Sequence, residues 1–507
     1  MSYIDEKVAP KREERLGACI EFGGTACELK RKFGEGCLKN SGRGFGQGSI
    51  CQLLPGTAIL NSIPDSVVIV HGSIGCGSAG HNQNASIRWR QSLSGSSNPR
   101  GTLWISTNLN EKDVVSGGEE KLEEAIIEAD RRYRPASIIV VSSCVPGIIG
   151  DDIDSVAARL QPRVNGTILP VHCEGFKTKI MATAYDAIYH SISRNLLEDE
   201  DQEEDRKILE DELEAAKEKL RRSKLVNLLN VSSMTPFDEK ELIRLLNSLG
   251  LEVNVYPCFT HPEDMKYATW AALSVSTCPT HDDYFIKHLE EKYGIPYILR
   301  HMPIGISNTS AWLRDIAKFF NMEDAAERLI KRETSELNEA LAPISKNLAG
   351  KKAMLSSGEV RTFATAVWLQ ELGMDIVAVR PYHYDEFGGI ELDKLASVNP
   401  DLKVNVATVQ PFETVNLIER NRPDIYLGHN SDNVWAAKEG IPVLPIYGGA
   451  NTYVGYTGAF DIARRINRVL KNPSFNKQLK DNVRQPYYRS WYSEEPFRFI
   501  TEGSVDL

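Results

Sequence analysis

The sequence contains no long hydrophobic run and no excess of basic residues. No apolar stretch approaches the ~20 residues that span a bilayer, and the N-terminal residues MSYIDEKVAPKREERLG lack the apolar core of a secretory signal. The 59 Lys and Arg residues are outnumbered by 69 Asp and Glu residues, which gives a formal net charge of −10. This balance argues against nucleic acid or an anionic membrane as the main partner. We therefore expect a cytoplasmic protein that binds neither.

Two further absences argue against disulfide bonds, zinc knuckles and ATP hydrolysis. The nine cysteines contain no C-x-x-C pair and no regular spacing, so neither a disulfide framework nor a zinc knuckle is expected. No G-x-x-x-x-G-K-[ST] motif occurs, so the chain should not hydrolyse ATP itself. With 42% hydrophobic and 25% charged residues, the composition is that of an ordinary globular protein.

Short β-branched runs alternate with amphipathic helical segments, a pattern that predicts parallel sheets covered by helices. The expected strands are 66–70, 102–106, 137–143, 167–172, 225–231, 252–258, 273–278, 352–357, 374–379, 403–408, 424–429 and 442–447. We predict an α/β protein of three Rossmann-like parallel-sheet domains around a central metal-cofactor cleft. The expected divisions are an N-terminal extension at 1–48, α/β domain I at 49–197, a charged helical linker at 198–222, α/β domain II at 223–345, and α/β domain III with C-terminal helices at 346–507.

Three cysteines stand where a strand or a short apolar run ends. Cys51, Cys76 and Cys144 lie in GSICQLLPG, VVIVHGSIGCGSAG and SIIVVSSCVPGIIGDD. Because the C-terminal ends of parallel strands face one crevice, these thiols can converge there. Thiolates are soft ligands that favour iron–sulfur clusters or zinc, and Gly-rich turns leave room for a bulky ligand. A lone cysteine is more often an ordinary buried thiol, but three at strand ends favour a metal cluster.

Several motifs occur in one order from about Gly48 to Leu479. They are HGSIGCG, EKDVVSGGEEKL, SSCVPGIIGDDIDSV, PVHCEGF, CPTHDDYFIKHLEEKYGIP and GYTGAFDIARRINRVLKNPSF. Together they resemble the α-type subunit of the catalytic component of nitrogenase.

The resemblance implies that the three cysteines hold half of a P-cluster-type eight-iron iron–sulfur cluster at the boundary with a homologous β-type subunit, in an α2β2 heterotetramer. A four-iron cubane usually takes four cysteines, so three ligands also call for a partner chain on physical grounds. A separate ATP-dependent iron–sulfur reductase homodimer is the implied electron donor.

A second metal site is implied by Cys278, which ends the run LSVSTC and matches the cysteine that holds the active-site cofactor in this superfamily. The family's cofactor histidine aligns with Tyr447, and no histidine follows His429 in the chain. A neutral phenol is a poor ligand for molybdenum or vanadium. We therefore expect a large iron–sulfur active-site cluster whose heterometal is open, with molybdenum disfavoured.

The expected pocket also departs from that of nitrogenase. On the segment KTKIMATAYDAIYH, read as a helix, Met181 and Tyr185 replace a Gln and a His that face bound dinitrogen in the family. Tyr is a weaker acid than His and Met is apolar, although packing in the core would explain both residues equally well. Arg361 in GEVRTFA is retained beside the cofactor position, where a guanidinium can hold an anionic cluster. His429 either contacts the cofactor or is a hydrogen-bonded loop residue.

These features favour a nitrogenase-like reductase that keeps both metal sites but not the dinitrogen pocket, as in the methylthio-alkane reductases. The resemblance then implies reductive C–S cleavage of a small volatile methyl thioether to methanethiol and a hydrocarbon. The alternatives are a scaffold for nitrogenase-cofactor assembly, an alternative nitrogenase α subunit and a tetrapyrrole reductase, and the retained Cys278 counts against the last.

Overall fold

The structure, a computed structural model, describes residues 3–35, 42–44, 46–48, 50–81, 88, 92, 102–197, 220–229, 235–448 and 451–501. Most of the predicted charged linker, residues 198–219, and Cys37, a cysteine to which the sequence assigns no role, lie outside these residues. Within them, no helix has the length and apolar character required to cross a membrane.

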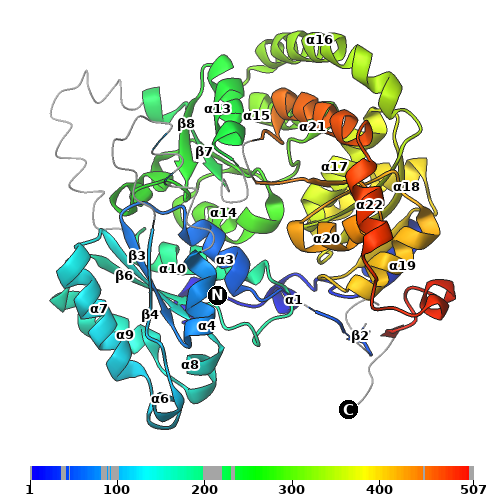
Figure 1. The fold of residues 1–507 in the computed structure, drawn as a ribbon. Coiled ribbons are helices and arrows are strands. Elements are labelled where there is room, and N and C mark those ends of the chain that lie inside the picture. The colour runs from blue at the N-terminus through cyan, green and yellow to red at the C-terminus, as the bar shows by residue number, and fades with distance from the viewer. Residues whose placement is uncertain are drawn as a thin grey trace.

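The first sheet is parallel, with the strand order β4-β3-β5-β6, and lies at the lower left of Figure 1. Its strands are β3 (Ser66–His71), β4 (Leu103–Ser106), β5 (Ser137–Ser142) and β6 (Thr167–His172). The accompanying helices are α3 (Leu53–Leu60), α4 (Ile74–His81), α6 (Glu111–Ser116), α7 (Glu119–Tyr133), α8 (Cys144–Ile149), α9 (Ile153–Leu160), η3 (Gln161–Arg163) and α10 (Thr183–Asn195).

Both faces of this sheet are covered, which explains why β3 and β5 are buried at every position. Val67 and Ile69 pack into a core with residues of α7 and α9. The alternate residues, Val68 and Val70, point to the opposite face and join the main core with residues of α3 and α10.

The second sheet, green in Figure 1, is also parallel, with the order β10-β9-β7-β8. Its strands are β7 (Leu225–Leu229), β8 (Glu252–Tyr256), β9 (Leu273–Val275) and β10 (Tyr297–Ile298), with helices α13 (Pro236–Ser248), η5 (Pro262–Trp270) and α14 (Pro279–Tyr293). A capping box between Thr235 and Asp238, with Pro236 in the first turn, fixes the start of α13.

The third sheet has six strands in the order β1-β13-β12-β11-β14-β15. They are β1 (Phe22–Thr25), β11 (Lys352–Ser357), β12 (Asp375–Pro381), β13 (Lys403–Val406), β14 (Ile425–Gly428) and β15 (Val443–Pro445). Around it lie α2 (Ala26–Gly34), α15 (Gly305–Phe319), α16 (Glu323–Leu348), α17 (Glu359–Glu371), η6 (Glu386–Gly388), α18 (Gly389–Val398), α19 (Pro411–Asn421), α20 (Asn430–Lys438), α21 (Gly455–Leu470) and α22 (Ser474–Asn482). The remaining elements are η1 (Tyr3–Asp5), α1 (Arg12–Arg15), η7 (Arg489–Ser493) and the antiparallel pair β2 (Gly42–Arg43) and β16 (Ile500–Thr501).

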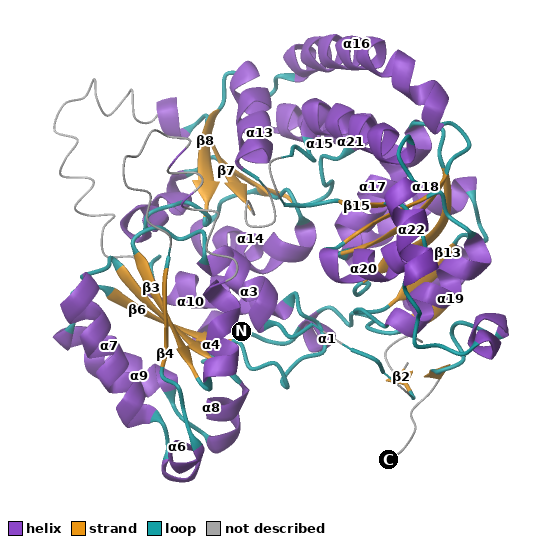
Figure 2. Ribbon diagram, in the orientation of Figure 1, coloured by secondary structure: helices purple, strands orange, loops and turns teal. Residues whose placement is uncertain are grey.

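Part of the predicted N-terminal extension belongs to the third sheet. Strand β1 pairs antiparallel with β13, so that Phe22 lies opposite Val406. The other pairs in this sheet are parallel. A strand from the beginning of the chain therefore lies at one edge of a sheet built from its last third, in which Figure 2 labels β13 and β15.

The prediction of an α/β fold with Rossmann-like domains is confirmed, with the antiparallel edge strand β1 added to the third sheet. Every strand expected above is present, but β9 and β15 are half as long as expected, and residues 230–231 of the expected strand 225–231 lie outside the described residues. One local prediction is wrong: Met181 does not lie on a helix, because α10 begins at Thr183. The residues before it form turns that are held by Glu13, which accepts hydrogen bonds from the Thr178 hydroxyl and the Lys179 backbone N–H.

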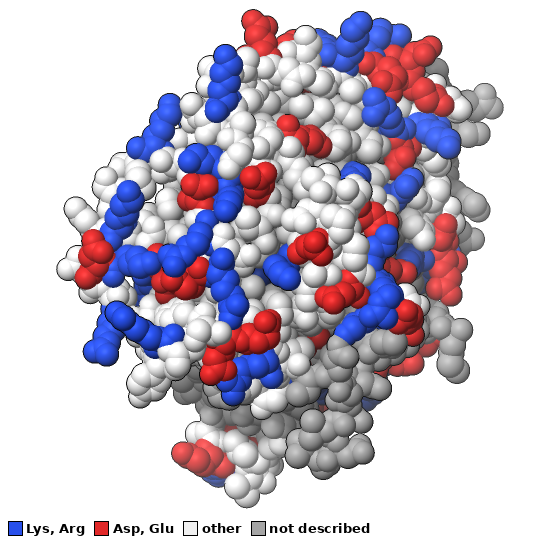
Figure 3. Space-filling model, turned by 90° about the vertical axis from the view of Figure 1, so that its right-hand side faces the viewer, with Lys and Arg blue, Asp and Glu red and all other residues white. Residues whose placement is uncertain are grey.

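The three sheets share one continuous hydrophobic core, to which Val68, Val226 and Leu355 contribute from β3, β7 and β11. Helices α10 and α14 lie against each other in its centre, where Tyr189 stacks on Phe285 and donates a hydrogen bond to Asp282. The face of the molecule in Figure 3 intersperses basic and acidic side chains. That face therefore offers no continuous basic patch for nucleic acid.

Candidate functional site

Cys51, Cys76 and Cys144 come together at the carboxyl edge of the first sheet. Cys76 lies on α4, which follows β3, and Cys144 begins α8, which follows the neighbouring strand β5. Cys51 precedes α3 and is exposed, whereas the other two thiols are half-buried. Burial raises the pKa of Cys51, and the nearby Cys144 and Cys76 raise it further. All three are free thiols.

Gly175 makes the space between two of these thiols. A Cβ atom there would lie 2.4 Å from Cys51 Sγ and 3.5 Å from Cys144 Sγ. A hydrogen bond holds the loop that contains Gly175, because the Gln52 side chain donates to the Glu174 carbonyl at 2.7 Å. Sequence reasoning included Gly175 only as part of the PVHCEGF motif and did not identify its contact with the thiols.

Large apolar side chains surround this group on the outside of the molecule. Ile74 and Ile148, on the same helices as Cys76 and Cys144, are 61% and 70% exposed. Leu54 and Phe176, which follow Cys51 and Gly175 closely in the sequence, are exposed as well. An apolar rim of this kind is typical of a protein–protein interface.

Cys278 lies in the interior, at the junction of β9 and α14. It occupies the N-cap position of α14 and is 5% exposed. Burial, and then the carboxyl group of Asp282, raise the pKa of its thiol to about 12. Tyr185 on α10 is close enough for Cys278 to raise the pKa of its phenol, although burial is the larger cause. Arg361 on α17 opposes both shifts, so these three side chains face the same region.

Sequence reasoning missed His281, a histidine in this region. It lies one turn after Cys278 on α14, and its backbone N–H donates to the Cys278 carbonyl at 2.8 Å. Its ring lies against that of Tyr185, with 3.8 Å between the centroids and 30° between the planes. Within the described residues its buried Nδ1 has no hydrogen-bond partner. Burial, with Arg12 and Arg361, lowers its pKa well below the ordinary value, so the imidazole is neutral at pH 7. The Cys-x-x-His spacing at the start of a helix was the available signal.

His429 and Tyr447 form a pair. The Tyr447 hydroxyl lies 2.8 Å from His429 Nδ1, and the two rings stack at 3.9 Å. Burial and Arg361 lower the pKa of His429 to about 4. Arg361 also donates a hydrogen bond to the Ile446 carbonyl at 3.2 Å, which ties α17 to the loop that carries Tyr447. Met181 is half-buried in the turn before α10.

The sequence pattern of the family described as nitrogenase component 1 type oxidoreductase matches residues 51–471. The chain belongs to this family. It is 28% identical over 462 residues to the nitrogenase iron-molybdenum cofactor biosynthesis protein NifE of Rippkaea orientalis, with 89% of each chain covered. It is 26% identical to the nitrogenase molybdenum-iron protein alpha chain of Methanothermobacter thermautotrophicus, over 93% of this chain and 94% of that one.

The fold of this component 1 type oxidoreductase is that of a solved nitrogenase. The structure of nitrogenase Cp1 at pH 5 matches with a TM-score of 0.70 and 21% identity, covering 88% of this chain and 92% of that chain. The predicted superfamily is therefore confirmed. The relatives include both a cofactor biosynthesis protein and nitrogenase alpha chains, so membership of the family does not choose between those roles.

The donor sets of both regions suit iron–sulfur groups. Cys51, Cys76 and Cys144 offer three accessible thiols around the space that Gly175 leaves open. In the interior, Cys278 offers one thiol beside the guanidinium of Arg361, which can offset the charge of an anionic cluster.

The surroundings of His172, the last residue of β6, predict that the free energy of unfolding depends on pH. Burial alone would lower its pKa, but Asp154 at 2.7 Å and Glu174 at 3.1 Å outweigh burial and raise the pKa to about 9. The folded-state pKa thus exceeds the unfolded value, so the charged imidazole stabilises the fold fully below about pH 6.5 and loses this effect as the pH rises through 9. His172→Gln should lower the free energy of unfolding by on the order of 2 kcal/mol at pH 6 and by much less at pH 9.5. Urea unfolding at the two pH values measures this, and an equal loss at both would contradict it.

Proposed function

We propose that this chain is the α-type catalytic subunit of a nitrogenase-like, ATP-dependent reductase that cleaves the C–S bond of small methyl thioethers. The observation that supports it most is the interior group of Cys278, Tyr185, His281 and Arg361, combined with the absence of a histidine from the loop that carries Tyr447. A cluster-binding thiol is retained there, whereas the side chains around it differ from those expected for dinitrogen.

The proposed reaction consumes two electrons and two protons. For dimethyl sulfide, one C–S bond breaks, the departing carbon takes one hydrogen to give methane, and the sulfur takes the other to give methanethiol. For 2-(methylthio)ethanol, the same two electrons and two protons give methanethiol, ethylene and water. The electrons come from a separate iron–sulfur ATPase, because this chain has no phosphate-binding loop.

Each of the four interior side chains has its own role in the proposed reaction. Cys278 holds the active-site cluster, which supplies low-potential electrons when bound, and Arg361 offsets its negative charge. Tyr185 stays protonated at neutral pH, since burial and Cys278 raise its pKa, and its hydroxyl can donate a hydrogen bond to a sulfur atom. His281 is neutral, and among the described residues its Nδ1 has no hydrogen-bond partner, which suits it to make a hydrogen bond to a bound substrate beside Tyr185.

The accessible thiols suit a cluster that is shared between two subunits and passes electrons to the interior. Cys51, Cys76 and Cys144 would hold half of a P-cluster-type eight-iron cluster, with the other half on a homologous β-type partner in an α2β2 assembly. The exposed rim that includes Ile74 and Ile148 would then be buried against that partner. The surface near these three cysteines that stays outside the interface suits docking of the ATP-dependent reductase, since electron transfer requires proximity.

The experiment supplies dimethyl sulfide or 2-(methylthio)ethanol to the complex with its ATP-dependent reductase, and methane, ethylene and methanethiol are measured. A parallel reaction under dinitrogen is assayed for ammonia. We expect hydrocarbon and methanethiol in equal amounts and ammonia at background. Ammonia at a comparable rate would contradict the proposal and favour an alternative nitrogenase.

A second candidate, a scaffold for cofactor assembly, is favoured by the similarity to NifE over 89% of both chains. A scaffold would turn over neither substrate and would release its interior cluster to a second protein. The same purified complex distinguishes the two, because iron that transfers to an added cluster-free acceptor, without any thioether product, supports the scaffold.

A further inference from the structure

Three buried side chains outside the group around Cys278 form a compact set of metal-binding donors. Glu359 begins α17, and His383 and Asp385 follow β12. One ligand atom from each lies within 4.8 Å of the other two. Elsewhere in the described residues, no other three His, Cys, Asp or Glu side chains offer ligand atoms at this spacing.

The ring of His383 points an unpartnered nitrogen at both carboxylates. Its Nε2 lies 3.7 Å from Glu359 Oε2 and 3.5 Å from Asp385 Oδ2, and it has no hydrogen bond in the part of the chain that the structure describes. The side chain is 3% exposed, so water does not replace the missing partner freely. Two ligands held about 2.1 Å from one tetrahedral cation lie about 3.4 Å apart. The observed spacings are therefore long for hydrogen bonds and right for two ligands of one ion.

Backbone contacts hold the two carboxylates in place. Both oxygens of Glu359 accept from the Asp385 N–H, at 3.1 and 3.2 Å, and Asp385 Oδ1 accepts from the Phe387 N–H at 3.0 Å. Within the described residues, Asp385 Oδ2, the oxygen that faces His383, has besides that ring a long contact of 3.5 Å to Arg12. The donors are thus preorganised, as a metal site requires.

The surrounding charges leave a deficit of positive charge. Two guanidinium groups, Arg12 and Arg15, serve a network of four carboxyl groups, which are Asp186, Asp283, Asp385 and Glu359. Lys287 reaches Asp283 at 3.8 Å from the surface, but it is shared with Glu386 at the same distance. With all four carboxyl groups ionised and His383 neutral, two formal negative charges remain, and one divalent cation would balance them.

We propose that Glu359, His383 and Asp385 bind one divalent first-row transition-metal cation, a site that is independent of the proposed reductase function. One imidazole and two carboxylates suit Mn²⁺, Fe²⁺ or Zn²⁺ better than Ca²⁺, which takes oxygen ligands only. The cation stabilises the junction of α17 and the segment after β12 by joining their buried donors.

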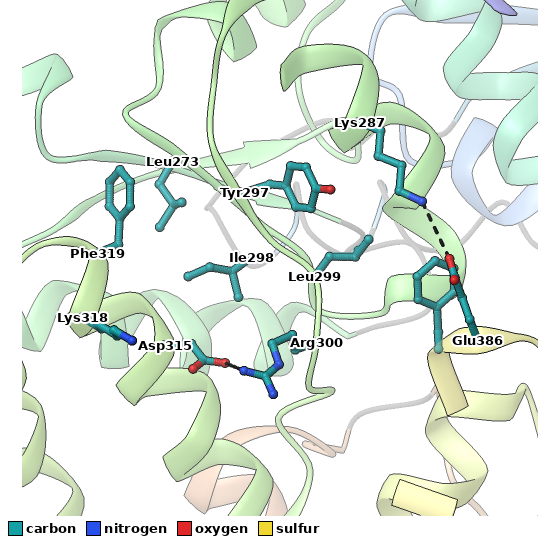
Figure 4. A pocket seen from close by; sticks show the side chains of 11 residues that line it. Leu273, Lys287, Tyr297, Ile298, Leu299, Arg300, Asp315, Lys318, Phe319 and Glu386 are labelled. Carbon is teal, nitrogen blue, oxygen red and sulfur yellow. Dashed lines mark ion pairs between the residues drawn. The ribbon is translucent and has the colours of Figure 1, made fainter. Parts of the chain in front are cut away.

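The segment that follows Asp385 lines a hollow at the surface. A hollow of about 730 Å³ lies along β10 and α15, and Glu386 and Phe387, directly after Asp385, form part of its wall. Figure 4 shows Lys287 reaching across to Glu386 at one side of this hollow, with the pair Arg300 and Asp315 at another. The chain therefore passes from a buried ligand to the wall of an open hollow within one residue.

The test uses Mn²⁺ alone on the full chain after treatment with a chelator. Free Mn²⁺ is followed by its electron paramagnetic resonance, and the bound ion is examined for coupling to ¹⁴N. The wild type should bind one Mn²⁺ per chain with ¹⁴N coupling, and Glu359→Gln and His383→Gln should each weaken binding at least ~10-fold.

Two variants are matched controls. Glu371→Gln removes a carboxylate at the other end of α17, and His288→Gln removes another buried histidine whose Nε2 has no hydrogen-bond partner among the described residues. Both should bind as the wild type does. Wild-type protein that binds no Mn²⁺, or binds it without ¹⁴N coupling, overturns the site even if a variant fails to fold. Equal losses in the controls overturn it as well.

Discussion

Replacing Cys278 by alanine should abolish hydrocarbon formation from thioethers, with a loss of ~100-fold or more, while the interface cluster stays in place. The reason is positional: the thiol is buried at the start of α14, beside Arg361 and Tyr185, and nothing else in the proposed group offers a thiolate. Gas chromatography of methane and ethylene measures the loss. Iron per chain and the paramagnetic signal of the reduced complex report on the remaining cluster.

Two other cysteine variants make this result specific. Cys258→Ala removes a different buried thiol, just after β8 in the same part of the chain, and should keep most of the activity. Cys76→Ala should give the converse pattern, with the interface iron lost. Cys278→Ala protein that kept more than half of the activity would show that the active site lies elsewhere.

Replacing Arg12 by methionine should lower the free energy of unfolding by about 3–5 kcal/mol, the usual effect of leaving buried charges unpaired. Arg12 is fully buried, and it contacts Asp283 at 2.6 Å, Asp186 at 3.2 Å and Asp385 at 3.5 Å. These carboxylates come from α14, α10 and the segment after β12, so one guanidinium joins the N-terminal segment to distant parts of the chain. Urea unfolding measures the change.

Arg31→Met is the matched control. Arg31 pairs with Glu35 at 3.0 Å on the exposed side of α2, and such pairs contribute about 0–1 kcal/mol. An Arg12→Met effect no larger than this would mean that Arg15, or protons on the carboxyl groups, take over the neutralisation.

Much of the fold could be predicted because its determinants are local. The run SVVIVH is β-branched and apolar at its four central positions, as expected of a strand covered on both faces, and it forms β3. The helix EEKLEEAIIEADRRY carries its apolar residues at helical spacing and forms α7, whose Leu122 and Ile126 are fully buried. Met181 was placed wrongly on a helix, because the contacts of Glu13, more than one hundred residues away, hold that segment in turns.

Some features of the candidate site could also be predicted from the sequence, and others could not. The position of Cys51, Cys76 and Cys144 at strand or run ends, the lack of a phosphate-binding loop and the lack of a histidine after His429 could be read directly from the sequence. The convergence of the three cysteines follows from a rule of topology, since the carboxyl ends of parallel strands lie at one edge of the sheet. The pairing of Tyr447 with His429 could not be read, because no periodic pattern encodes which loop side chains stack.

By itself, the sequence determined that this is an α/β protein with cysteines at strand or run ends and with no histidine after His429. Only the tertiary structure decided that His281 lies against Tyr185 beside Cys278, that β1 closes the third sheet, and that Arg12 meets Asp385, 373 positions away. The physical reason is the range of the interactions. Hydrophobic periodicity sets each strand and helix from its own residues, whereas buried polar groups take whichever partner the packing of the whole chain brings within hydrogen-bond reach.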